Sequence, residues 1–128
     1  MNNLTLVVLE DIFSVYKLSK DSLIPKWAFE GDFCSVTRTL DELSIVCRDK
    51  NIPCGVQCER GWKGFKVDGT LDFGLIGILN SLTRPLANAG ISIFAVSTFD
   101  TDYIFVKVKN FQKAVDVLKA EGFVVKKD

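Results

Sequence analysis

Residues 90–107 have the sequence GISIFAVSTFDTDYIFVK, which predicts two strands joined by a short polar turn. Residues 91–96 are apolar at nearly every position, so we expect a strand covered on both faces. Residues 103–106 are aromatic or β-branched, as strands prefer. The turn at 97–102 carries hydroxyls and carboxylates, whereas a tight hairpin needs only a pair such as Asn-Gly. This surplus of polar groups favours a binding role, although Asp and Thr also suit a turn for structural reasons alone.

The composition limits the class of protein. A chain of 128 residues that is 48% hydrophobic can form one compact domain or two very small fused ones. Its formal net charge is zero, which argues against nucleic acid or an anionic membrane as the main partner. The sequence contains no histidine, so it lacks the commonest general base and the commonest metal ligand. We therefore expect no enzyme activity, no cofactor and no metal.

The four cysteines are expected to be reduced. The N-terminus lacks the pattern of a signal peptide, and no apolar run is long enough to span a bilayer. We therefore expect a cytoplasmic protein with reduced thiols, in which Cys34 and Cys47 belong to the core. Cys54 and Cys58 have the spacing of a weak metal motif, but no second pair or histidine completes a set of four zinc ligands.

The first half of the chain predicts a mostly β structure with short helical turns. Strands are predicted at residues 4–9, 13–18, 33–39 and 43–47. In this prediction Glu10 and Asp11 end the first strand. Residues 21–29 combine capping residues, a proline and aromatic residues, which favours a short helical turn. The stretch 49–61, with its proline and glycines, is the predicted boundary between the halves.

The second half predicts a regular α+β arrangement. Strands are expected at 62–67, 91–98, 103–106 and 123–125, with helices at about 72–89 and after Asn110. We expect Pro85 to kink the first helix or restart it near Thr83. The order βαββαβ folds, through two right-handed crossovers, into a ferredoxin-like antiparallel sheet with both helices on one face. Strand 91–98 would then lie at an apolar sheet edge, which favours a homodimer or pairing with the first half.

Several segments resemble the small tandem ACT-domain proteins. They are ERGW at 59–62, LDF at 71–73, PLANAGISI at 85–93, STFDTDYI at 97–104 and, in the first half, TLDELSIV at 39–46. The resemblance covers roughly residues 4–126, and the STFDTDY run is its most specific part. Related ACT proteins of animal nutrient signalling sense arginine.

The resemblance implies a function and a division of the chain. ACT domains bind amino acids or other small molecules, commonly between paired domains, and regulate an attached or partner protein. The implied division is an ACT domain at 61–128 and a degenerate, β-rich ACT-like half at 1–60. The first half lacks the second helix of the standard pattern, which leaves a ligand site of its own in doubt.

The residues of the second half also suit a free amino acid as ligand. An α-carboxylate prefers backbone N–H donors at a helix N-terminus, so we expect Asp72, Phe73 and Gly74 to provide them. Gly74 and Gly77 would lie in the first turns of that helix, where they serve either a ligand or close packing on the sheet. An α-ammonium prefers carboxylate and hydroxyl oxygens, for which the candidates are Asp102, Thr98 and Asp72.

The remaining candidate residues come from the segments that carry the resemblance. Phe99 could pack on the ligand side chain, although a phenylalanine in a turn often only pins its loop. Ser97, Ser44 and Ile45 complete the predicted ligand-binding set.

The alternatives belong to three other classes: an enzyme, an RNA-binding protein and a protein–protein interaction module. An acylphosphatase-like hydrolase would need an arginine in the loop after its first strand, where this chain has Asp68-Gly69-Thr70. Asp100 and Asp102 could act as an acid–base pair, but no nucleophile accompanies them. An RNA-binding sheet would need a basic surface, which the neutral charge disfavours. A protein–protein interaction module with a vestigial pocket is the alternative that we retain.

Overall fold

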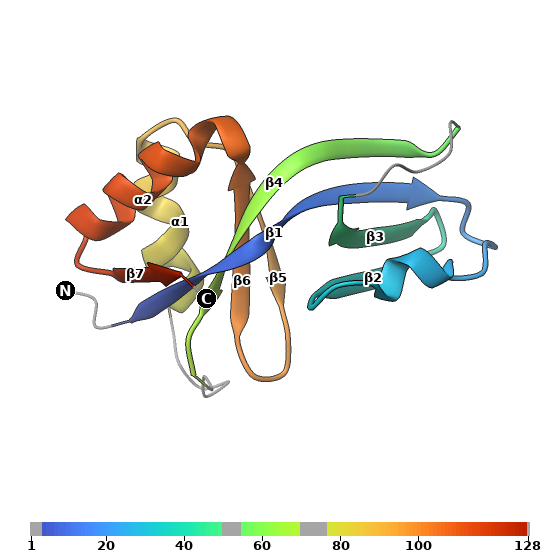
Figure 1. The fold of residues 1–128 in the computed structure, drawn as a ribbon, viewed down its shortest axis with the longest axis horizontal. Helices are drawn as coiled ribbons and strands as arrows, with labels where there is room; N and C mark the ends of the chain where they lie inside the picture. The colour runs from blue at the N-terminus through green and yellow to red at the C-terminus, as the bar shows by residue number, and fades with distance from the viewer. Residues whose placement is uncertain (1–3, 50–54, 70–76, 128) are drawn as a thin grey trace. The chain divides into compact units, whose positions relative to one another are not determined.

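The computed structural model describes residues 4–49, 55–69 and 77–127, which form an α+β protein with one sheet and two α-helices (Figure 1). The elements are β1 (Thr5–Leu18), the short helical turn η1 (Lys26–Phe29), β2 (Cys34–Arg38), β3 (Leu43–Arg48), β4 (Gln57–Val67), α1 (Ile78–Asn88), β5 (Ile93–Ser97), β6 (Asp102–Lys107), the turn η2 (Val108–Asn110), α2 (Phe111–Ala120) and β7 (Val124–Lys127). The predicted α+β class is confirmed, and from β4 onward the elements follow the order βαββαβ.

The chain divides into two compact units. The first unit comprises Met1–Glu10 and Lys63–Asp128, and the second comprises Asp11–Trp62. The strands β1 and β4 are hydrogen-bonded neighbours, and each contributes residues to both units.

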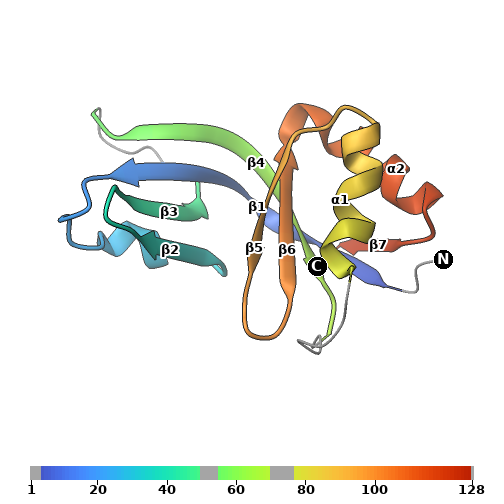
Figure 2. The same ribbon diagram turned by 180° about the vertical axis from the view of Figure 1, so that it is seen from behind.

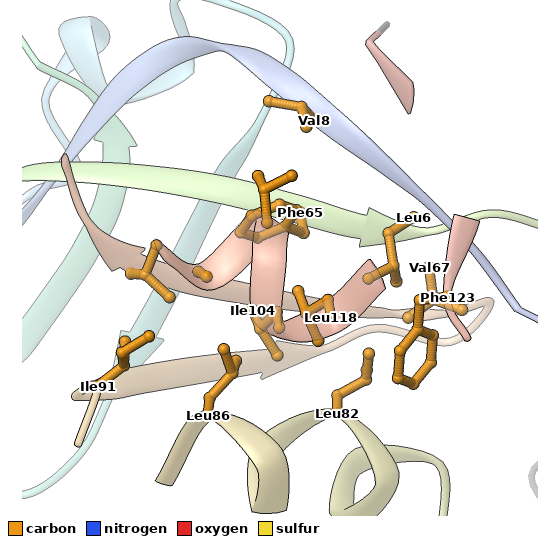
Figure 3. Packing of buried hydrophobic residues seen from close by; sticks show 13 residues of the cluster. Leu6, Val8, Phe65, Val67, Leu82, Leu86, Ile91, Ile104, Leu118 and Phe123 are labelled. Carbon is orange, nitrogen blue, oxygen red and sulfur yellow. The ribbon is translucent and has the colours of Figure 1, made fainter. Parts of the chain in front are cut away.

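In the first unit, α1 and α2 pack on one face of the strands β7, β1, β4, β6 and β5, which are neighbours in that order. The core between the helices and the sheet is shown in Figure 3. It includes Leu82 and Leu86 of α1 and Leu118 of α2, all fully buried. Leu82 and Leu86 are four residues apart, and the buried residues of α2, Ala114, Val115 and Leu118, recur at three- and four-residue spacing. Each helix therefore presents an apolar stripe to the sheet.

Two predictions about the strands of this sheet are wrong. β1 runs without interruption from Thr5 to Leu18, through Glu10 and Asp11. These acids do not end the strand because no glycine or proline accompanies them, and the Glu10 side chain is exposed. The predicted antiparallel sheet of the second half is wrong at its last strand. β7 pairs in parallel with β1, with Thr5 opposite Val124, because β4 already has β1 and β6 as its neighbours.

The strand β5 lies at the end of the strand order, so the predicted edge position is confirmed. It pairs antiparallel with β6 only, with Phe94 opposite Phe105. Ala95 and Ser97 are exposed, and the other residues of β5 are half-buried. The prediction that both faces of this strand are covered is therefore wrong within the described part of this chain.

The first helix differs from its prediction at the start. In the described residues it begins at Ile78, and residues 70–76 lie outside the described part of the chain. Gly77 is not inside the helix but precedes it as the N-cap, with φ of 83°, a conformation that favours glycine. The helix continues through Pro85 to Asn88, so it does not restart at Thr83. Gly90, with φ of 77°, follows its C-terminus, where this conformation favours glycine.

The second unit contains β2, β3 and the adjoining parts of β1 and β4. β3 pairs antiparallel with both β1 and β2. A small core forms around the ring of Tyr16, whose centroid lies 4.9 Å from that of Trp27 in the predicted helical turn η1. β4 starts at Gln57, within the stretch predicted as a boundary, and Gly61 adopts a φ of 80° inside this strand, a conformation that favours glycine.

The predicted core cysteines lie opposite each other in this unit. Cys34 of β2 is the register partner of Cys47 of β3. Cys47 is fully buried, and both Cys34 and Cys58 pack against the same cluster. Burial raises the pKa of the Cys47 thiol to about 11, and Cys34 contributes in the same direction.

We expect Cys47 to resist alkylation. At pH 8 a thiol with this pKa is about 0.1% ionised, and only the thiolate reacts with iodoacetamide. Mass spectrometry after timed labelling should show Cys47 modified at least tenfold more slowly than Cys34, which is half-buried. The unfolded protein, in which all thiols react alike, is the control. Equal labelling rates for Cys34 and Cys47 in the folded protein would contradict the expectation.

Candidate functional site

The turn between β5 and β6 is closed by hydrogen bonds between two threonines. The N–H of Thr98 donates to the carbonyl oxygen of Thr101 at 2.8 Å. The Thr98 hydroxyl donates to the same oxygen at 3.0 Å and accepts the N–H of Thr101 at 3.2 Å. The hydroxyl proton of Thr98 is therefore engaged, while its oxygen keeps one lone pair for a further donor.

Thr101 joins this turn to β4. Its hydroxyl donates to the carbonyl oxygen of Val67 at 2.6 Å, and the residue is only 4% exposed. The sequence analysis did not identify this role, since a threonine in a polar turn carries no signal of burial. The bond holds the turn against the last residue of β4.

The structure brings Ser97 and Asp102 together at the mouth of the turn. They are direct partners in the β5–β6 register, so their side chains point to the same face of the sheet. That face also carries Ile104 and Val106, two and four residues along β6, which are buried beneath the helices. The carboxylate of Asp102 therefore lies on the helix-covered face, where it is half-buried.

The helix α1 begins at the same end of the first unit. α1 precedes β5 and runs antiparallel to it, so the start of α1 lies at the end where the β5–β6 turn lies (Figure 2). At this start, the carbonyl oxygen of Gly77 accepts the N–H of Ser81 at 2.9 Å. No side chain caps the N-terminus of α1 in the described residues.

The other predicted ligand residues are placed as follows. Phe99 is 81% exposed at the tip of the turn. Ser44 is half-buried and Ile45 is fully buried in β3, which belongs to the second unit. The predicted carboxylate-binding residues, Asp72–Gly74, lie outside the described residues.

Comparison with protein families gives a direct assignment. The sequence profile of the ACT domain matches residues 57–120. This chain belongs to the ACT-domain family. A profile for the N-terminal domain of another family matches residues 11–55. Comparison with curated proteins gives no match.

Solved structures show the same ACT-like fold. A protein from Agrobacterium tumefaciens is 39% identical, with a TM-score of 0.92, over 100% of this chain and 96% of its own. The aspartate kinase of Clostridium acetobutylicum is 15% identical with a TM-score of 0.67, over 91% of this chain but only 34% of the enzyme. A domain described as the C-terminal regulatory domain of aspartate kinase from Porphyromonas gingivalis is 15% identical with a TM-score of 0.57, over 92% of this chain and 96% of its own.

ACT domains are regulatory modules that bind amino acids. Within residues 4–49, 55–69 and 77–127, no three histidine, cysteine or acidic side chains lie together as metal ligands. Neither of the described helices is long and apolar enough to cross a membrane.

Proposed function

We propose that this ACT-domain protein is a non-catalytic sensor that binds a free amino acid at the end of the first unit and regulates a partner protein. The observation that carries the proposal is the pairing of Asp102 with Ser97 on the helix-covered face of an ACT-domain sheet. The proposal includes a cytoplasmic location, as expected from the sequence.

The polar groups at this end suit an α-ammonium. The carboxylate of Asp102 supplies the charge, and a charge-assisted hydrogen bond is about twice as strong as a neutral one. The hydroxyl of Ser97 and the remaining lone pair of the Thr98 oxygen can accept the other N–H groups. The α-carboxylate is assigned to backbone N–H groups at Asp72–Gly74, which precede α1 in the chain. Phe99 remains a proposed contact of the ligand side chain.

The ligand can be identified by a thermal-shift screen of the standard amino acids. A ligand at a hundred times its dissociation constant should stabilise the protein by roughly 2.7 kcal/mol. If no amino acid raises the melting temperature, the retained alternative, an interaction module with a vestigial pocket, is favoured. The exposed ring of Phe99 would suit such a module.

Asp102→Asn is expected to weaken binding of the identified amino acid by about tenfold to a hundredfold. The substitution keeps the shape of the side chain and removes the charge that pairs with the ammonium. Calorimetry measures the affinity, and the melting temperature without ligand should stay close to that of the parent. Asp100→Asn, in the exposed part of the same turn, is the matched control. The assignment fails if Asp102→Asn binds like the parent, or if Asp100→Asn is the more damaging change.

The proposal extends to assembly. β5 presents an unpaired edge in the described sheet, with Phe94 and Val96 half-buried, and such an edge can pair with a second copy. We expect light scattering to give the mass of a homodimer, about twice 14.3 kDa. A monomer mass at all accessible concentrations would overturn the dimer but leave the ligand site untouched.

We also propose that residues 1–60 are a degenerate ACT-like half beside an ACT domain at 61–128. Supporting this, the described part of the second unit is built from strands and one short helical turn, η1. Without a helix start such a half lacks donors for an α-carboxylate, so one ligand per chain is the expected stoichiometry.

A further inference from the structure

The first unit contains a second candidate binding site, a cavity of about 340 Å³ between the sheet and the start of α2. Its lining residues come from β1, β4, β7 and α2: Val8, Leu9, Glu10, Lys63, Phe111 and Lys127. The cavity is distant from the proposed amino-acid site along β4. Val67, at one end of this strand, accepts the hydroxyl of Thr101, whereas Lys63 precedes Val67 by four residues.

Two lysines occupy positions on the core face of the sheet. Lys63 alternates with Phe65 and Val67, both fully buried in the core under the helices. Lys127 is the register partner of Val8, which belongs to the same core, and follows Val125 by two residues. Lys63 is half-buried and Lys127 is exposed, so the strand pattern places two ammonium groups at the rim of this core.

The ammonium of Lys63 is held in a defined position. It donates to the carbonyl oxygen of Glu10 at 2.8 Å and lies 6.0 Å from the centroid of the Phe111 ring. An ammonium has three donors, so two remain for a ligand. Among the described residues no carboxylate forms an ion pair with Lys63 or Lys127, although the exposed Glu10 also lines the cavity.

The start of α2 adds a further positive contribution. Phe111 is the first residue of this helix and lines the cavity. The side chain of the N-cap Asn110 makes no capping hydrogen bond, and the first turn contains no acidic residue. No side chain therefore compensates the positive end of the helix dipole, although the N–H of Phe111 donates to the carbonyl oxygen of Val108 in η2.

We propose that this cavity binds a small anionic metabolite through a phosphate or carboxylate group held by Lys63 and Lys127. The volume is at the lower end of the range for ligand pockets, so the ligand is compact. Phe111 offers an aromatic surface to its carbon skeleton. The site is separate from the proposed amino-acid site and gives the sensor a second input.

The test uses pyrophosphate, inorganic phosphate and citrate as probes, with binding measured by calorimetry. At least one probe should bind saturably, and Lys63→Gln and Lys127→Gln should each weaken it tenfold or more. The matched controls are Lys66→Gln and Lys126→Gln, which lie on the same strands but on the opposite face, and which should bind like the parent. Preference for pyrophosphate over citrate would identify a phosphate ligand, and the reverse a carboxylate.

Amide chemical shifts locate the bound probe. Saturating probe should shift the resonances of Lys63, Gln112 and Lys127 and leave those of Ser97 and Asp102 unchanged. The proposal is overturned if no probe binds the parent saturably, if the two variants bind like the controls, or if the shifts cluster at Asp102. Because Asp102→Asn should not change probe binding, failure here is distinguishable from failure of the amino-acid site.

Discussion

Replacing Gly64 with valine is expected to lower the free energy of unfolding by about 3 kcal/mol or more, because there is no space for a side chain at this position. A Cβ atom on Gly64 would lie 2.7 Å from Cε2 of Phe105 and 2.9 Å from Cδ1 of Leu9. The ring of Phe105 cannot move away easily, since it stacks on Phe94 with centroids 4.7 Å apart. Denaturant unfolding of the two proteins measures the difference.

The double variant Gly64→Val/Phe105→Leu tests the cause. Leucine is smaller than phenylalanine and leaves room beside residue 64. The free energy of unfolding lost in the double variant should therefore be smaller than the sum of the two single losses by at least about 1 kcal/mol. Simple additivity would show that the overlap with Phe105 is not the reason. A Gly64→Val protein within about 0.5 kcal/mol of the parent would contradict the packing argument itself.

The periodicity of the sequence predicted most elements of this fold. Alternation and β-branched residues located β2, β3, β5 and β6, and helical spacing located α2. These signals are local, so they can be recognised without knowing which strands pair. The partner of β7 was not predictable in this way. Either β1 or β4 could have been its neighbour from the pattern alone. The observed neighbour is β1, and this pairing joins residues more than a hundred positions apart, such as Thr5 and Val124.

The candidate site was predictable only as a group of residue types. The turn sequence indicated that Thr98, Asp100 and Asp102 lie close together, but not which side chain faces the helices. The register of β5 and β6 makes that distinction, because it sets Asp102 opposite Ser97 and on the face of Ile104. The two lysines of the second cavity were missed for a similar reason. Alternation puts Lys63 on the face of Phe65 and Val67, but the sequence does not show that this position lies beside Phe111 of α2.

Thr101→Val is expected to lower the free energy of unfolding by about 2 kcal/mol, the largest effect we expect in the turn. Valine matches the shape of threonine, so the substitution leaves no cavity and removes only the hydroxyl. That hydroxyl is buried and donates to the carbonyl oxygen of Val67 at 2.6 Å, and the substitution deprives this oxygen of its buried donor. Amide hydrogen exchange should also become faster at Thr98 and Asp102, since the turn loses its attachment to β4.

Two further variants separate the hydroxyl of Thr101 from other contributions. Thr101→Ser keeps the donor and loses a methyl group, so it should cost about 1 kcal/mol and leave hydrogen exchange in the turn unchanged. Thr98→Val removes a hydroxyl that bonds only within the exposed turn, so it should cost about 0.5–1 kcal/mol. If Thr101→Ser and Thr101→Val lower the free energy of unfolding equally, the turn is held to β4 by the packing of the Thr101 side chain and not by its hydrogen bond. If the hydrogen bond is responsible, Thr101→Val should also weaken amino-acid binding at Asp102, because a loosened turn no longer holds that carboxylate in a fixed position.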